Sequence, residues 1–427
     1  MPDPAPAGPG NAASRPGPTA LDRSDRQNWP LVIAAGLAVF LAMLDTYIVA
    51  VALPRIGTDF RVEPASVQWV ALAYFLPMAA LVLPTGRWLD SAGHRSAFLL
   101  GIIGFAVASL ACAVAGNLPV LLGARLFQGG FAAMLTVLTP VLVTVAVAPS
   151  VRGRAMGIVT TLGPLGALAG PGVGGWLTAV AGWRWLFVIN LPISAVAALI
   201  VLRCLPARGR LPLPDRGWAL DTGLLGGAVL VVVGALTVAA SDGPGWAALA
   251  LVAVPLLLTW RRLPTSSGLT ALVAIRPVAG GVAALVLTST ATSAVVFLVP
   301  FVLAGQAGAS AAGAGLMLTA LPLAMVLLGP VGGVLADRWG AGRVALAGAV
   351  IIAGGMLLLL PLTTAWPGLG LAWRLAILGA GMAAFVGPNQ TVIMNAAPGS
   401  ALATAGGASG LARSLGFGLG PAVAAAA

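Results

Sequence analysis

Residues 86–93 read GRWLDSAG, and residues 333–340 read GVLADRWG. Both octets have Gly at the first and last positions and Asp at the fifth, and each follows a long hydrophobic run. A helix–loop–helix unit that recurs at this distance indicates a chain built from two related halves. Such internal repeats are common in membrane transporters.

The composition places most of the chain in lipid. Of its 427 residues, 59% are hydrophobic and 8% are charged, whereas an ordinary soluble domain has roughly 25% charged residues. The mean hydropathy of +1.02 agrees with this difference. A soluble protein of this size could not cover its surface with so few charges. We therefore predict a multi-pass protein of the lipid bilayer.

Several functions are excluded by residues that are missing or rare. All 22 basic residues are Arg, and without Lys the chain has no Walker A motif and no Schiff-base chemistry. The single His94 and the two separated cysteines, Cys112 and Cys204, predict no metal site and no disulfide. We find no nucleophile–base pair and no cofactor box. The sequence therefore predicts a protein that is not an enzyme and has no catalytic residues, metal or cofactor.

The net charge of +11 is better explained by membrane topology than by nucleic acid binding. The arginines stand singly or in pairs between apolar runs and form no basic stripe. Most of them fall in segments on the same side of the membrane as the N-terminus, so the positive-inside rule places the N-terminus in the cytoplasm. Residues 1–30 are rich in Pro, Ala, Gly and charge and predict a disordered cytoplasmic tail.

A membrane-spanning helix needs about 20 apolar residues, and the sequence contains thirteen runs of about that length. Short connections between the runs predict antiparallel neighbours. The runs are 31–53, 67–86, 97–116, 118–147, 155–180, 184–202, 218–239, 244–260, 279–304, 311–335, 344–362, 370–396 and 402–427.

Asp45 lies well inside the first run, about 21 Å along the helix from its start. A lone carboxylate inside a span is costly and marks an ion or substrate pathway, and this one can bind and release a proton. Arg125 is the obvious partner, because a guanidinium stays charged in lipid. Two alternatives stay open: a permanent structural pair, and an arginine that snorkels to the outer surface.

The run at 155–180 carries closely spaced glycines around a proline. Small residues at this spacing let two helices approach closely, and a proline bends the span. We predict a close, kinked interface that can rock or seal. The residues are Gly166, Gly170, Pro171, Gly174 and Gly175.

Together these segments resemble the major facilitator superfamily, and within it the fourteen-helix drug:proton antiporter branch. The resemblance covers residues 31–427. Trp88, Ser91 and His94 depart from the family's loop signature. The residues that match are Gly86, Asp90, Gly93 and Arg95 in the first loop signature; Gly333, Asp337 and Gly340 in its second copy; Arg125, Gln128 and Gly129 in the fourth-span signature; the five residues of the 155–180 run in the antiporter signature; and the stretches 44–54 and 182–192 in the signatures of the branch.

The resemblance implies an all-α membrane fold of two pseudo-symmetric six-helix bundles with an extra helix pair between them. The N-terminal bundle is expected at 31–203, a linker with two extra transmembrane helices at 204–278, and the C-terminal bundle at 279–427. The branch has fourteen helices, so a C-terminal bundle that is one helix short is expected here.

The resemblance also implies alternating access, in which the two bundles rock around a central cavity and proton entry drives the cycle. Asp90 is expected against the N-terminus of the helix at 402–427, and Asp337 near that of the helix at 155–180, because a helix N-terminus favours an anion. These two acids would latch a cytoplasmic gate. The predicted gate residues are Gly86, Asp90, Gly93, Arg95, Asp337 and Arg338.

Seven polar residues in the expected spans are candidates to line the cavity. Each one could equally form a hydrogen bond between helices. They are Tyr47, Tyr74, Gln128, Thr136, Asn389, Gln390 and Asn395. Arg413 lies too deep in the last run to ignore, and two alternatives stay open for it: it could face the cavity or the loop latch.

The leading hypothesis is proton-coupled export of a small amphipathic drug or natural product across the cytoplasmic membrane. The protein is expected to act as a monomer. Its expected partners are its substrate, protons and lipid, and it is not expected to bind nucleic acid. A proton-coupled uptake symporter or facilitator is the first alternative, and the antiporter glycines argue against it. A scaffold or receptor without transport is the second, and Asp45 argues against it.

Overall fold

The structure is a computed structural model that describes residues 27–207, 209–263, 266–304, 319–359 and 368–426. Within these residues all regular elements are helical, and ten helices are long and apolar enough to cross a membrane. The all-α membrane fold is therefore confirmed. Most of the expected tail at 1–30 lies outside the described residues.

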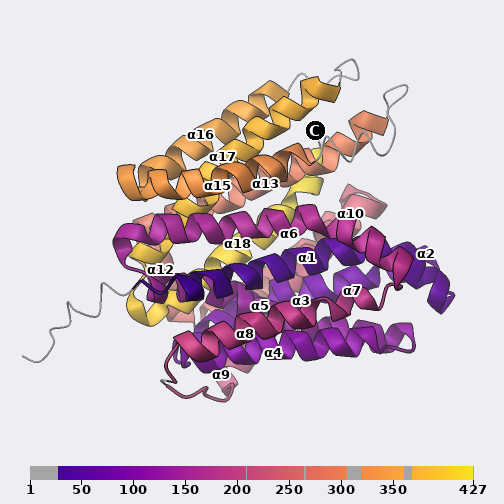
Figure 1. Cartoon of the computed structure of the whole chain (residues 1–427), viewed down its shortest axis with the longest axis horizontal. Helices are drawn as coiled ribbons and strands as arrows, with labels where there is room; N and C mark the ends of the chain where they lie inside the picture. Colours follow the sequence, from indigo (N-terminus) through magenta and orange to yellow (C-terminus); the bar gives the residue numbers. More distant parts are fainter. Residues whose placement is uncertain (1–26, 208, 264–265, 305–318, 360–367, 427) are drawn as a thin grey trace, which may run out of the picture.

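The first six spans lie together as an N-terminal bundle, drawn in indigo to magenta in Figure 1. The short helices α7 and α8 together form the sixth span. The elements are α1 (Trp29–Phe60), α2 (Pro64–Val67), α3 (Trp69–Asp90), α4 (His94–Ala113), α5 (Leu118–Ala146), the 3₁₀ turn η2 (Pro149–Val151), α6 (Arg152–Val180), α7 (Trp185–Val188) and α8 (Asn190–Cys204).

The C-terminal bundle, drawn in orange to yellow, lies beside α6 in Figure 1. A 3₁₀ turn precedes α18, just as one precedes α6 in the first bundle. The elements are α12 (Ser267–Ala274), α13 (Arg276–Ala304), α15 (Ala320–Trp339), α16 (Ala341–Leu359), α17 (Gly368–Ala396), the 3₁₀ turn η6 (Gly399–Ala401) and α18 (Leu402–Ala426).

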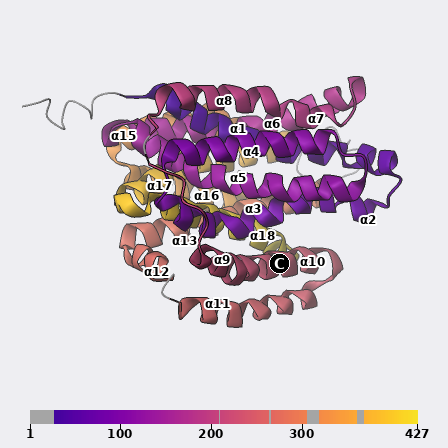
Figure 2. The ribbon, with the colours of Figure 1, turned by 90° about the horizontal axis from the view of Figure 1, so that it is seen from below.

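The extra helices between the bundles form a layer along one edge, as Figure 2 shows. They are α9 (Arg216–Asp221), a π turn (Thr222–Gly226), α10 (Gly227–Asp242), the 3₁₀ segment η4 (Pro244–Val252) and α11 (Ala253–Arg261). Helix α10 packs against α3 of one bundle and α18 of the other. This layer therefore borders the junction between the two bundles.

Helices cover the described parts of all thirteen predicted runs, but three of the runs fall outside the ten apolar spans. The run at 218–239 is divided among α9, the π turn and α10. The run at 244–260 begins as a 3₁₀ segment after Gly243, whose φ is 116°. Helix α18, the third, includes many glycines and Arg413, which lower its hydropathy. The expectation of thirteen full-length apolar spans was thus too simple.

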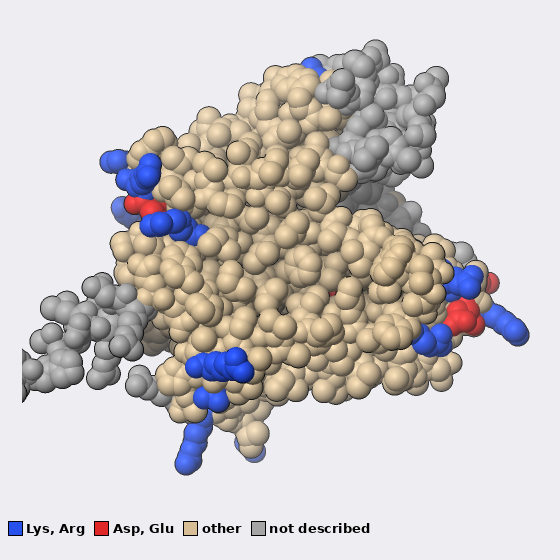
Figure 3. All heavy atoms as spheres, viewed as in Figure 1, with Lys and Arg blue, Asp and Glu red and all other residues tan. Residues whose placement is uncertain are grey.

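Lipid tails are as apolar as the helix surfaces, so the hydrophobic effect does not drive the spans together. Close packing between small residues holds them instead. A Cβ atom at Gly348 of α16 would lie 2.6 Å from the backbone nitrogen of Phe385 in α17. One at Gly406 of α18 would lie 2.6 Å from the carbonyl oxygen of Val137 in α5. In the view of Figure 3, charged side chains gather near the ends of the helices and leave an uncharged face between them.

Both octets that revealed the repeat connect one span to the next on the same side. Asp90 is the last residue of α3, and Gly93 precedes α4 with an extended backbone. Asp337 lies in the last turn of α15, and Gly340 follows it with a φ of 91°, a conformation that glycine adopts readily. The two acids therefore end helices, although the sequence analysis expected them in loops.

Candidate functional site

The described interior of the N-terminal bundle holds one ion pair, between Asp45 of α1 and Arg125 of α5. Nη1 of Arg125 donates to Oδ2 of Asp45 at 2.5 Å, and the two side chains are 1% and 0% exposed. Nε of Arg125 donates to the carbonyl oxygen of Val70 at 3.0 Å. The snorkelling alternative is therefore wrong, because the guanidinium points into the bundle. The alternative of a permanent structural pair stays open.

Three further polar side chains form a hydrogen-bond network around Asp45. Nε2 of Gln128 donates to Oδ1 of Asp45 at 3.0 Å, and Nδ2 of Asn190 donates to the same oxygen at 2.8 Å. Oγ of Ser109 accepts from both amides, at 2.7 and 3.2 Å. All three side chains are fully buried. The carboxylate is thus held by one cation and two amides, as a buried charge requires.

Sequence reasoning missed Ser109 and Asn190. Each is a polar residue inside an apolar stretch, and this was the signal that could have found them. We call Asp45, Ser109, Arg125, Gln128 and Asn190 the buried carboxylate cluster. Four helices contribute to it, so a change in the charge of Asp45 would act on the packing of most of the N-terminal bundle.

At one end of the spans, Asp90 joins the two bundles. Its Oδ1 accepts from the backbone N–H of Ala403 at 2.7 Å, and its Oδ2 accepts from that of Thr404 at 3.2 Å. The hydroxyl of Thr404 donates to the same carboxylate. These donors are at the first turn of α18, where backbone N–H groups lack helical partners and the helix dipole favours an anion.

Asp337 makes the equivalent contact in the other direction. Its Oδ1 accepts from the backbone N–H of Gly153 at 2.7 Å, and its Oδ2 accepts from that of Arg154 at 3.0 Å. Nε of Arg154 also donates to Oδ2, at 3.3 Å. Asp90 of the N-terminal bundle therefore binds the N-terminus of α18, and Asp337 of the C-terminal bundle binds the N-terminus of α6. We call these two contacts the latches.

The other predicted gate residues divide between two places. A Cβ at Gly86 would lie 2.7 Å from the carbonyl oxygen of Ala403, so Gly86 allows α3 to approach α18. Gly93 and Arg95 instead contact the linker: the Gly93 N–H donates to the carbonyl of Arg210 at 3.1 Å, and Nη1 of Arg95 donates to that of Leu205 at 3.3 Å. Arg338 is exposed, and Arg154 takes the place beside Asp337.

We expect Asp90→Asn to weaken its latch and open the cytoplasmic side more often, because the amide loses the charge that the start of α18 favours. The reporter is Thr161→Cys, in a protein without its two native cysteines. Thr161 packs against Gly329 of α15 at the contact between the bundles. Thiol labelling from the cytoplasmic side is expected to speed up severalfold.

Glu63→Gln is the control for Asp90→Asn, because it removes an exposed acid from the segment that follows α1. It should leave the labelling rate unchanged. Equal rates in Asp90→Asn and the parent protein would show that the contact is not a latch.

Asp221, which the sequence analysis did not single out, ties the extra helices to the same end of α3. It is 1% exposed, forms an ion pair with Arg87, and accepts from Nε1 of Trp260 at 2.8 Å. Trp88, a departure from the family's loop signature, donates from its indole to the carbonyl of Pro212 at 2.9 Å. The extra helices are therefore anchored three residues from the Asp90 latch.

The seven predicted cavity residues lie in different surroundings. Tyr74 and Gln128 are buried in the N-terminal bundle, and the Tyr74 ring lies 4.4 Å from the Arg125 guanidinium carbon. Asn389 and Gln390 are also buried, and Asn389 donates to the carbonyl of Gly281 at 3.0 Å.

The remaining three candidates differ among themselves. Asn395 accepts from Arg152 at 2.5 Å, close to the latches, so it belongs to the contact between the bundles. Thr136 is half-buried and donates to the carbonyl of Ala132. Tyr47 is 43% exposed. The helical repeat of the sequence could not have shown which of these residues are buried and which are exposed, because the helices are apolar on nearly all sides.

The glycines of α6 pack against α1 of the same bundle. Cβ atoms at Gly166 and Gly170 would lie 2.5 Å from the carbonyl oxygen of Phe40 and 2.6 Å from Cβ of Tyr47. Gly175 has no atom of another residue within 4 Å of its Cβ position. Helix α6 runs unbroken through Pro171. The close approach thus fixes α1, the helix of Asp45, rather than the surface between the bundles.

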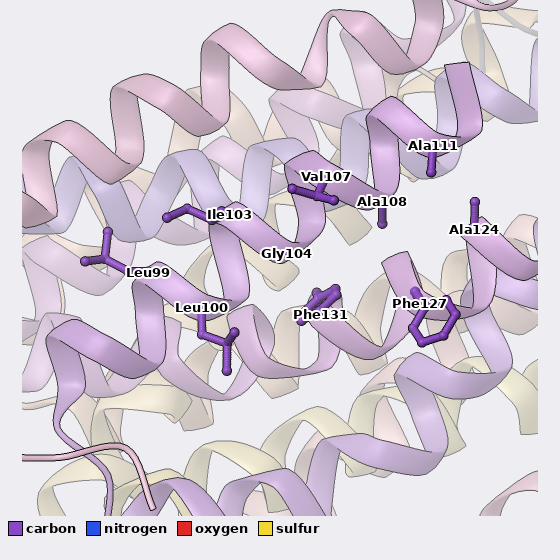
Figure 4. Close-up of a pocket in the computed structure, with 10 residues that line it drawn as sticks. All are labelled: Leu99, Leu100, Ile103, Gly104, Val107, Ala108, Ala111, Ala124, Phe127 and Phe131. Carbon is purple, nitrogen blue, oxygen red and sulfur yellow. The ribbon is translucent and has the colours of Figure 1, made fainter. Parts of the chain in front are cut away.

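An apolar groove of about 490 Å³ lies between α4 and α5, as Figure 4 shows. Ile103, Val107, Phe127 and Phe131 are among its lining residues, and no charged side chain lines it. It lies on the outer surface of the bundle, and its residues offer no group for recognition or catalysis. The described residues also include no group of His, Cys, Asp or Glu that could hold a metal ion.

Comparison with known proteins gives consistent results. Residues 35–421 match the family described as the Major Facilitator Superfamily. The tetracenomycin C resistance and export protein of Streptomyces glaucescens is 31% identical over 407 residues, which are 92% of this chain and 75% of that protein. The riboflavin transporter RibZ of Clostridioides difficile is 29% identical and matches 93% of this chain and 87% of its own length.

Among solved structures, the proton:xylose symporter XylE shares the fold with a TM-score of 0.64 at 16% identity, over 91% of this chain and 87% of XylE. At that identity the likeness concerns the fold alone.

Proposed function

Because the chain belongs to the major facilitator superfamily, we propose that it exports small amphipathic molecules across the cytoplasmic membrane in exchange for protons. The observation that carries the proposal is the ion pair of Asp45 and Arg125, buried in a membrane-spanning bundle. A scaffold has no need of such a costly charge pair, whereas a proton-driven transporter needs a carboxylate that can change its charge.

The latches supply the second part of the cycle. Both latches are made in this structure. We place them on the cytoplasmic side, so that in our proposal the described conformation is closed toward the cytoplasm. In our proposal the transporter works as a monomer with a cytoplasmic N-terminus and needs no cofactor besides the coupling proton. Protonation of Asp45 removes one charge of the pair, frees Arg125 and favours the other conformation, in which the latches open.

The fold alone does not give the direction of transport, because XylE, which shares this fold, is a proton symporter. Export is favoured by the similarity to the tetracenomycin C export protein and by the antiporter glycines of α6. The alternative is a symporter or facilitator for uptake, and only transport measurements separate the two.

The test uses purified protein in vesicles oriented inside out, with the lumen made acidic. We expect amphipathic dyes and antibiotics from a broad panel to accumulate in the lumen while protons leave it. Collapse of the pH gradient with an ionophore should stop accumulation, and vesicles without protein provide the background. Movement of substrate and protons in the same direction would show symport, and a panel without any transported compound would contradict the proposal.

A further inference from the structure

Arg413 lies at the middle of α18, about 16 Å along the axis from the start of that helix. It is half-buried. Among the described residues, no acidic side chain forms an ion pair with it and no acceptor is within hydrogen-bond distance. An arginine at membrane depth stays charged, and without a protein partner it normally faces a water-filled cavity.

The position of Arg413 around α18 shows where its side chain leaves the helix. Gly406 is seven residues earlier, or two turns, and so lies on the same face. That face meets the N-terminal bundle, because a Cβ at Gly406 would lie 2.6 Å from the carbonyl oxygen of Val137 in α5. Gly420, seven residues later on the same face, packs against Ser293 and Ala294 of α13. Arg413 therefore lies where this face of α18 passes from the N-terminal bundle to its own bundle.

The neighbouring turns of α18 are packed on both sides. A Cβ at Gly410 would lie 3.2 Å from Cγ2 of Thr136 in α5, and one at Gly416 would lie 2.8 Å from the carbonyl oxygen of Val286 in α13. Arg413 lies between these two contacts, at the junction of the bundles.

The charge of this region is positive. Asp45 and Arg125 neutralise each other at 2.5 Å, and Asp90 and Asp337 are engaged at helix N-termini on the cytoplasmic side. The charge of Arg413 is thus not balanced by any described side chain. A guanidinium offers a planar fork of donors that matches a carboxylate or a sulfonate.

We propose that Arg413 binds an anionic group of the transported molecule, so that the preferred substrates are amphipathic anions such as aromatic carboxylates or sulfonates. This inference rests on the proposed transport function and adds the charge of the substrate to it. Arg413 is then a specificity-determining residue that contacts substrate, while Asp45 and Arg125 handle the proton.

The test measures binding to the purified protein in detergent, without a pH gradient. The probes are two dyes with the same aromatic skeleton: anilinonaphthalene sulfonate, an anion, and phenylnaphthylamine, which is uncharged. We expect the wild-type protein to bind the sulfonate at least about tenfold more tightly than the neutral dye, as loss of one charged hydrogen bond implies. Arg413→Gln should lose this preference and keep its affinity for the neutral dye.

Two controls and a competition experiment complete the test. Arg413→Lys keeps the charge and should retain part of the preference, and Arg343→Gln removes an exposed arginine of α16 and should retain all of it. With wild-type protein, aromatic carboxylates should displace the sulfonate dye, and their methyl esters should not. This competition needs no variant, so it remains decisive even if Arg413→Gln does not fold.

Equal affinity of the wild-type protein for the two dyes, or a sulfonate preference that survives in Arg413→Gln, would overturn the proposal. Because the assay contains no proton gradient, it gives the same answer whether transport is antiport, symport or facilitated diffusion. A failure of proton-coupled export would therefore leave a positive binding result intact, and a negative binding result would leave the export proposal intact.

Discussion

Replacement of Asp45 by Asn is expected to abolish uphill export driven by a pH gradient, with at least a hundredfold loss of accumulation. In the described residues Asp45 is the only acid within the membrane-spanning interior of the N-terminal bundle, and Arg125 is its only charged partner. Asn has nearly the same shape but can neither bind nor release the proton. Substrate binding, and exchange down a gradient, should remain at least partly intact.

The measurement is accumulation in inside-out vesicles with an imposed pH difference, compared with exchange in vesicles without one. Asp59→Asn is the matched control: it removes an acid from the same helix, but Asp59 is 43% exposed and pairs with Arg184 at 2.9 Å. This control should export normally. Full uphill export by Asp45→Asn would show that the proton enters elsewhere.

Stability must be separated from coupling in this experiment. Removal of one partner of a buried ion pair costs about 3–5 kcal/mol, because the other charge is left buried without compensation. The double variant Asp45→Asn, Arg125→Gln removes both charges and should regain part of that stability in thermal unfolding, but it should not regain uphill export. Recovery of export by the double variant would mean that the pair is only structural.

The sequence predicts the spans and the general plan of this protein well, because both depend on local properties. A run of about 20 apolar residues forms a helix in lipid wherever it occurs. The repeat of Asp90 and Asp337 at the ends of two spans indicated two related halves, and the structure places both acids at N-termini of helices from the opposite bundle.

The arrangement of side chains around the helices was less predictable. In a soluble helix the apolar stripe shows which face is buried, but α1, α5 and α17 are apolar on all sides. Tyr74 therefore looked like a cavity residue and is buried against Arg125 instead. The sequence analysis did not single out Asp221, because its contact with Arg87 depends on how the extra layer docks on α3. Contacts of that kind are set by tertiary packing.

Gly170→Leu is expected to abolish most export while the protein remains inserted in the membrane. A Cβ at position 170 would lie 2.6 Å from Cβ of Tyr47 and 3.2 Å from the backbone nitrogen of Ile48. Neither atom is the flexible end of a side chain, so α1 and α6 must separate. Overpacking of this kind costs about 1–3 kcal/mol. Because Asp45 lies only two residues before Tyr47 on α1, the displacement also disturbs the buried carboxylate cluster.

The chain offers a matched control in the same helix and the same glycine motif. Gly175→Leu adds the same side chain where no other residue lies within 4 Å, so it should be inserted and export normally. Both variants replace glycine inside α6 and gain the same helix propensity, so a difference between them reports packing against α1. Export in inside-out vesicles, normalised to the amount of inserted protein, is the measurement. Normal export by Gly170→Leu would show that the close approach of α1 and α6 is not needed for transport, and equal loss in both variants would mean that leucine disturbs α6 itself rather than its contact with the helix of Asp45.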